Sequence, residues 1–143
     1  MFKLTRFLPL LLILALLLSC DGSATGQSQS CRSTNNSGSC TGSYRTIKGR
    51  FHYSIELDQY RRGTPVQVEM TASIESGRLR MGLVEAAGQV AGSEVSVVVL
   101  PGQPATLTGV TPIADFDSAR ISLEAMDEAD VTGVEYTVKR VVQ

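Results

Sequence analysis

The chain has 143 residues, of which 43% are hydrophobic and 6% aromatic, and its formal net charge at pH 7 is −1. After a targeting segment and a polar segment, this length leaves room for one domain of about 100 residues and for a single core. The near-neutral charge argues against bulk attraction to nucleic acid, and the few aromatic rings argue against stacking of bases or sugars.

The first 20 residues have the composition of an export signal. Lys3 and Arg6 make the start positive, and the twelve residues from Phe7 to Leu18 carry no charge. A permanent membrane helix needs about 20 apolar residues, so this shorter run indicates a secretory signal. The run ends in Leu17-Leu18-Ser19-Cys20, where an aliphatic, a variable and a small residue precede a cysteine. This pattern resembles the lipobox of bacterial lipoproteins.

The lipobox resemblance implies a lipid anchor at Cys20. In lipoproteins the cysteine thiol receives a diacylglyceryl group and a dedicated peptidase cuts directly before it, so residues 1–19 would be removed as the signal peptide. Two or three acyl chains bind a membrane stably, at about 0.8 kcal/mol per buried CH₂. We therefore expect a protein of the cell envelope, anchored to a membrane with its domain outside the cytoplasm. The alternative is a plain secretory signal with an incidental cysteine, or an uncleaved anchor.

Residues 20–43 are predicted to form the lipidated cysteine and a flexible tether. After Cys20 the segment consists almost entirely of Gly, Ser, Thr, Asn and Gln, and it has too little apolar area to pack. Cys31 and Cys40 interrupt it, and the oxidising compartment to which the signal leads favours a disulfide between them. A metal site is the competing interpretation, but two thiols without a nearby histidine are half of a zinc site. A redox pair would be expected to have C-x-x-C spacing.

Residues 44–143 show the alternation of apolar and polar side chains that is typical of half-buried strands. Strands are expected over 46–58, 65–74, 78–85, 94–100, 103–113, 119–126 and 133–142, with a brief further one between Gly88 and Gly92. The side chains expected to face the core include Ile47, Tyr53, Met70, Met81, Leu123 and Val138, whereas Tyr44 and Tyr60 are expected to be exposed. Seven or eight short strands predict an antiparallel β-sandwich, similar in pattern to immunoglobulin-like and jelly-roll domains. A small β-barrel is the alternative.

No arrangement of residues predicts catalysis, and we expect neither an enzyme nor a cofactor. His52 is the single histidine, and the spacing identifies neither a nucleophile nor an orienting carboxylate for it. No metal site is predicted either. Calcium at the loop residues Asp115 and Asp117 is a weak alternative, because such residues more often serve turn chemistry.

Two classes of function remain. The first is a non-catalytic β-sandwich that presents a surface to another envelope protein, which the lack of catalytic groups and the Val- and Thr-rich strands favour. The second is an accessory module that binds an anionic polymer, a lipid head group or a glycan. Lys48, Arg50 and His52 motivate the second class, because their alternate positions would place them on one side of a strand as a cationic row. Most such rows are solvated faces or protect an edge strand.

Overall fold

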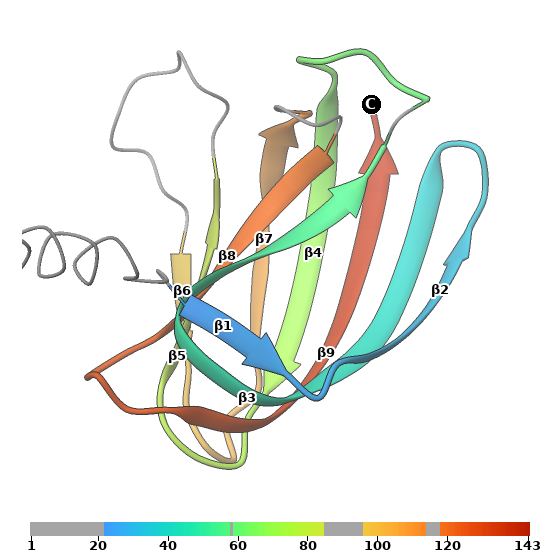
Figure 1. Ribbon diagram of the computed structural model, residues 1–143. Coiled ribbons are helices and arrows are strands. Elements are labelled where there is room, and N and C mark those ends of the chain that lie inside the picture. Colours follow the sequence, from blue (N-terminus) through green and yellow to red (C-terminus); the bar gives the residue numbers. More distant parts are fainter. Residues whose placement is uncertain (1–21, 58, 85–95, 114–117) are drawn as a thin grey trace, which may run out of the picture.

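The computed structural model describes residues 22–57, 59–84, 96–113 and 118–143, and these ranges contain nine strands (Figure 1). The strands are β1 (Gly22–Thr25), β2 (Ser28–Ser33), β3 (Ser37–Glu56), β4 (Pro65–Ser73), β5 (Leu79–Leu83), β6 (Ser96–Val99), β7 (Ala105–Pro112), β8 (Ser118–Ala125) and β9 (Val131–Val142). The predicted signal peptide, Cys20 and the brief strand between Gly88 and Gly92 lie outside the described residues. Among the described residues, no helical segment combines the length and hydropathy that crossing a bilayer requires.

All strand pairs are antiparallel, and the main path runs β6-β5-β8-β3-β9-β4-β7, with β1 and β2 paired to β3. The long strand β3 belongs to both layers of the fold. Residues 37–47 of β3 pair with β9 in the first sheet, and residues 50–56 pair with β8 in the second sheet. Gly49 lies between these two parts with a φ of 59°, a left-handed conformation that favours glycine.

The predicted all-β antiparallel class is confirmed, and the two sheets curve until the fold is nearly closed into a barrel. The two ends of the strand path, β6 and β7, approach each other without forming a ladder. At this closure Leu83 of β5 fills the space above Gly109 of β7, where a β-carbon would collide with the leucine side chain. The sandwich and the barrel alternatives therefore describe two aspects of one architecture.

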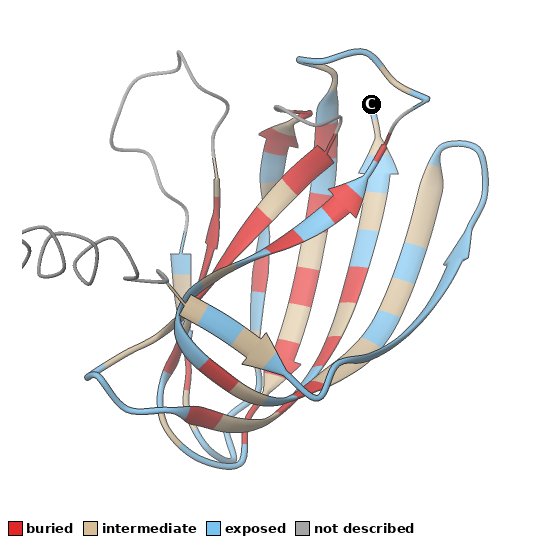
Figure 2. Ribbon diagram, in the orientation of Figure 1, coloured by how far each residue is buried: buried red, intermediate tan, exposed pale blue. Residues whose placement is uncertain are grey.

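The core lies between the two sheets and follows the predicted alternation (Figure 2). Along β4 every second side chain is buried, from Val66 to Ala72, and its outward neighbours are exposed or half-buried. The largest fully buried side chains include Ile47, Leu57, Met70, Leu79, Met81, Leu107, Ile121 and Leu123. The expectation for Tyr44 is wrong: it is only 2% exposed, because its ring stacks on Tyr136 inside the fold.

The structure replaces the predicted flexible tether with strands. Residues 22–25 and 28–33 pair with β3, and residues 37–43 are the beginning of β3 itself. Every side chain of β2 is exposed, so burial of apolar area does not hold this hairpin in place. Backbone hydrogen bonds to β3, which is itself paired with β9, supply the ordering that the sequence analysis did not anticipate.

The predicted disulfide between Cys31 and Cys40 is confirmed. The two cysteines are direct partners in the β2–β3 ladder, with their Cα atoms 4.1 Å apart. The bond therefore closes the hairpin and fixes its register.

Candidate functional site

The cationic row predicted on β3 is compensated by acidic neighbours. Lys48 pairs with Asp130 at 3.4 Å, and Arg50 pairs with Glu124 at 3.2 Å. Glu124 also accepts from Arg80 at 3.3 Å. These exposed pairs add little stability. They lower the local positive charge, but Glu124 is shared between Arg50 and Arg80, so the compensation is incomplete.

His52, the third member of the row, stays mostly neutral near pH 7. Burial, and then the nearby charges of Arg120 and Arg50, lower the pKa of its imidazole below the ordinary value of 6.5. The ligand role proposed for Lys48, Arg50 and His52 stays a prediction. The calcium alternative, Asp115 and Asp117, lies outside the described residues. Within the described ranges no group of three or more histidine, cysteine or acidic side chains gathers as a metal would need.

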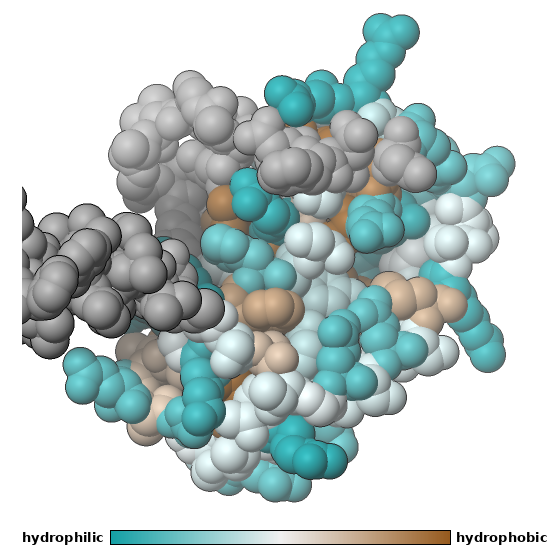
Figure 3. All heavy atoms as spheres, viewed as in Figure 1, coloured by the Kyte–Doolittle hydropathy of each residue, from teal (hydrophilic) through white to brown (hydrophobic). Residues whose placement is uncertain are grey.

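A cleft of about 450 Å³ opens between the disulfide-closed hairpin and the last part of β3. We call it the hairpin cleft. The residues that line it are Gln27, Gln29, Cys31, Arg32, Ser33, Gly38, Ser39, Cys40, Tyr53, Ser54, Ile55, Glu56 and Arg140. Most of them carry amide, hydroxyl or charged groups, so the cleft offers hydrogen bonds rather than apolar area. The side of the molecule seen in Figure 3 is also largely hydrophilic or near neutral, with small hydrophobic areas in between.

Two glycines of β3 make room for large side chains of β9. Gly38 pairs with Arg140, and a β-carbon at Gly38 would lie 2.9 Å from Nε of that arginine. Gly42 pairs with Tyr136, and a β-carbon there would collide with the tyrosine hydroxyl and with the backbone oxygen of Ser28. The bare backbone of β3 therefore provides the surface on which Arg140 and Tyr136 lie.

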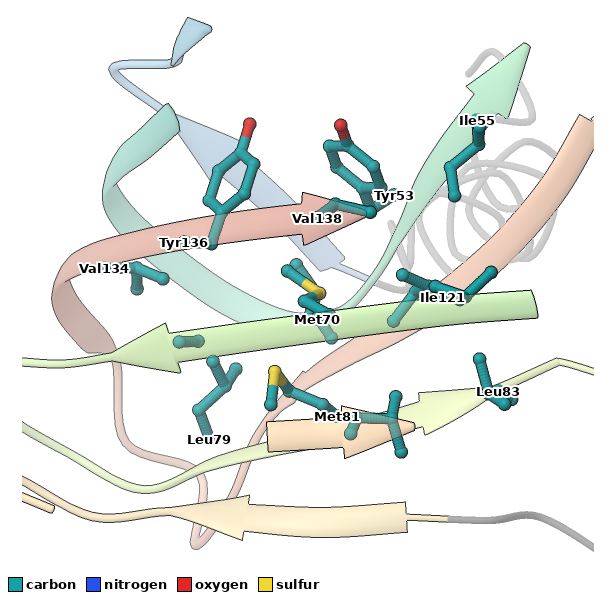
Figure 4. Close-up of a cluster of buried hydrophobic side chains, with 14 of the residues drawn as sticks. Tyr53, Ile55, Met70, Leu79, Met81, Leu83, Ile121, Val134, Tyr136 and Val138 are labelled. Carbon is teal, nitrogen blue, oxygen red and sulfur yellow. The ribbon is translucent and has the colours of Figure 1, made fainter. Parts of the chain in front are cut away.

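Three tyrosines form a cluster beneath the hairpin. The ring of Tyr136 stacks on Tyr44 at 5.3 Å between centroids and meets Tyr53 edge-on at 5.4 Å. In Figure 4 the hydroxyls of Tyr53 and Tyr136 point the same way, away from Met70 and Leu79. Burial raises the pKa of Tyr53 to about 12 and raises the pKa values of Tyr44 and Tyr136 as well. All three are therefore neutral hydrogen-bonding groups at physiological pH.

Gln29 ties the hairpin to the opposite wall of the cleft. Its amide nitrogen donates to the Tyr53 hydroxyl at 3.0 Å and contacts the sulfur of Cys31 at 2.9 Å. Its amide oxygen accepts from Gln27 at 3.1 Å. The disulfide and this amide chain together hold the cleft open at a fixed width.

One polar atom of the cleft has no partner among the described residues: the Nη1 atom of Arg140 is buried and makes no hydrogen bond with them. The hydroxyls of Tyr44 and Tyr136 are buried as well, but they lie close enough to raise or lower each other's pKa. Buried polar groups without partners are rare in proteins and call for an explanation, such as a water or a ligand.

The sequence analysis missed this site because it treated residues 20–43 as a tether. Gln29 and Cys31 share one side of β2, Gln27 directly precedes that strand, and Gly38, Cys40 and Gly42 share one side of β3. Recognising a cystine-closed hairpin would have placed the glutamines beside the disulfide. Arg140 would still have been missed, because a charged residue near the end of a strand is normally predicted to be exposed to solvent.

No protein-family model matches the chain, and no curated protein does. Solved structures with a similar arrangement of strands exist at low identity. Oxalate oxidase in complex with glycolate matches with a TM-score of 0.45 and 12% identity, over 84% of this chain and 53% of that one. The chain therefore spans about half the length of the oxalate oxidase chain.

Two further structures are covered over most of their length. A xylan-binding domain, CBM22-1 of Xyn10C from Paenibacillus barcinonensis, matches with a TM-score of 0.43 and 12% identity, over 87% of this chain and 86% of that one. A structure from work on Bacillus endospore appendages, which form disulfide-linked pili, matches with a TM-score of 0.43 and 18% identity, over 87% and 96%. These likenesses concern the β architecture alone.

Proposed function

We propose that the protein is a lipid-anchored envelope protein whose β domain is a non-catalytic binding module, and that the hairpin cleft binds a hydroxyl-rich ligand, a short glycan segment. The lipobox-like residues 17–20 support the anchor. The cleft carries the binding proposal, because the amides of Gln27 and Gln29 and the hydroxyl of Tyr53 form a polar rim in the same lining as Arg140, whose buried Nη1 atom has no partner among the described residues. Amides and hydroxyls can each donate and accept, which suits the hydroxyl groups of a sugar.

The binding proposal predicts that an amide on the cleft wall contributes to affinity. The purified full-length protein in detergent, titrated calorimetrically with cellotriose, chitotriose and maltotriose, should bind at least one of them. Replacement of Gln27 by alanine should weaken that binding by about fivefold or more, because one or two hydrogen bonds to the ligand are lost. Gln67→Ala is the matched control: this exposed glutamine lies on β4, outside the cleft, and its loss should leave affinity unchanged. Equal losses in both variants would remove the cleft from the proposal.

The anchor predicts a separate result. Cells that express the chain with Cys20→Ser should release the unlipidated protein from the membrane fraction, and intact mass should show no acyl chains, whereas the unaltered protein should carry them. Fractionation together with mass spectrometry gives the answer. Retention of the serine variant on membranes would contradict lipidation as the means of attachment.

A second candidate function, docking of another envelope protein, is favoured by the outer face of the first sheet. Val110 and Val141 are 55% and 47% exposed there and flank Gln67 across adjacent strands. The same face carries a hydroxyl row, made of Ser30, Thr41, Thr137, Thr71 and Thr106 in direct register on five neighbouring strands. A protein that binds no glycan yet crosslinks in cells to one dominant partner, through this face, would establish docking in place of glycan binding.

A further inference from the structure

We propose that the ligand of the hairpin cleft is an acidic glycan, and that the guanidinium of Arg140 binds its oxyanion, either the carboxylate of a uronic acid or the phosphate of a sugar phosphate. This inference rests on the proposed function. The added points are that the ligand is negatively charged and that Arg140 binds its charged group.

Arg140 occupies an unusual place for an arginine. Val134, Tyr136 and Val138 are buried at alternate positions of β9, and Arg140 continues this inward-facing series at the end of the strand. Its guanidinium lies over Gly38 and lines the cleft. The next residue back, Lys139, faces outward and pairs with Glu69 at 3.4 Å. Adjacent cations of β9 thus point to opposite sides of the sheet, and the inward one borders the cleft.

The charge of Arg140 is not matched by a carboxylate of the described residues, since none of these lies within ion-pair distance of its guanidinium. Its Nη1 atom is buried and has no acceptor among the described residues. A guanidinium presents paired donors in a rigid plane that fits a carboxylate or phosphate, so an oxyanion in the cleft would supply the missing partner.

The remaining charges of the cleft also favour an anion. Among the described residues of the lining, Arg32 and Arg140 stand against one carboxylate, Glu56, which gives this part of the cleft a net positive charge. The tyrosine and glutamine groups of the cleft are neutral, so they can bind the hydroxyls of the same sugar without opposing its charge.

Matched pairs of ligands test this inference. The full-length protein in detergent is titrated at low salt with trigalacturonate against galactotriose, and with glucose 6-phosphate against glucose. We expect the acidic member of at least one pair to bind about tenfold or more tightly than its neutral partner, because a hydrogen bond to a charged group is stronger than one to a neutral group. The pair that shows the preference identifies the oxyanion. The preference should shrink as salt is added.

Substitutions then locate the oxyanion contact. Arg140→Gln should bring the ratio of acidic to neutral affinity close to one. Arg140→Lys should retain part of the preference, since the charge remains but the paired donors are lost. Lys139→Gln, one residue away on the outer face, is the matched control and should change neither affinity. If Arg140→Gln does not fold, Glu56→Gln tests the oxyanion site instead. Removing this carboxylate from the cleft should tighten binding of the acidic ligand and not of the neutral one.

The outcomes separate the two proposals. Equal binding of acidic and neutral members by the unaltered protein overturns the oxyanion site and leaves glycan binding in place. A preference that survives Arg140→Gln, or an acidic affinity that Glu56→Gln does not change, also overturns it. Absence of binding to every sugar overturns both proposals.

Discussion

Raising the pH from 10 to 12 should destabilise the domain steeply. Burial raises the pKa of Tyr53 from 10.0 to about 12 in the folded state. Between these pH values the folded protein keeps the phenol proton that the unfolded chain has lost, so the free energy of unfolding falls as pH rises. A shift of this size corresponds to roughly 3 kcal/mol for Tyr53 alone. Tyr44 and Tyr136 act in the same direction, because burial raises their pKa values too.

Urea unfolding at a series of pH values, followed by circular dichroism, measures this loss. The stability should be level below pH 10 and should then decline. Tyr53→Phe should lower stability somewhat at neutral pH, because the hydrogen bond from Gln29 is lost. It should also flatten the alkaline decline, since one titrating group is gone. Tyr60→Phe, which changes a tyrosine outside the stacked cluster, is the matched control for loss of a phenol. An identical slope in Tyr53→Phe would contradict the account.

Gly42→Ala should be among the most damaging single substitutions in the first sheet. The added methyl group would collide with the Tyr136 hydroxyl on one side and the backbone oxygen of Ser28 on the other. Relief requires movement of a ring that is held by two neighbouring tyrosines, or of strand β2. We expect a loss of about 3 kcal/mol, at the upper end of the range for overpacked sites.

Thermal and urea unfolding of Gly42→Ala give this number, and Ser43→Ala is its control. Ser43 is the next residue along β3 and faces the outer side of the sheet, so its change should cost less than about 0.5 kcal/mol. Adding Tyr136→Phe to Gly42→Ala removes the hydroxyl oxygen, although the ring carbon Cζ and the Ser28 oxygen still lie in the way, and should restore a small part of the stability. If the double variant is as unstable as the sum of its single changes, contact with the tyrosine hydroxyl is not the cause.

The fold was largely predictable from residue 46 onward, because the apolar side chains there recur at every second position and are buried, even where β5 and β8 bury small residues between them as well. Met70, Leu79 and Met81 are buried as their positions predict. The same criterion failed for residues 22–43, where Ser, Gly and Gln bury almost nothing. That segment is ordered by its backbone and by one cystine, and neither contributes to an apolar pattern.

The candidate site was less predictable than the fold, since it depends on relations between distant strands. Lys48 and Arg50 form a row in the sequence, but their acidic partners lie 82 and 74 residues further along, in the turn after β8 and on β8. Arg140 became noticeable only when its position over Gly38 and its missing acceptor were seen together. A sequence shows that a charged side chain is present, whereas a structure shows whether an oppositely charged group lies beside it.

Because strands replace the predicted tether, the domain has less freedom to move away from its N-terminal attachment point. Strand β1 begins at Gly22, two residues after Cys20, and those two residues can span no more than about 7 Å. With the acyl chains proposed for Cys20, the folded body would rest directly on the lipid surface, unable to sweep through the space above it. Partners and glycans could then be bound only at the membrane surface.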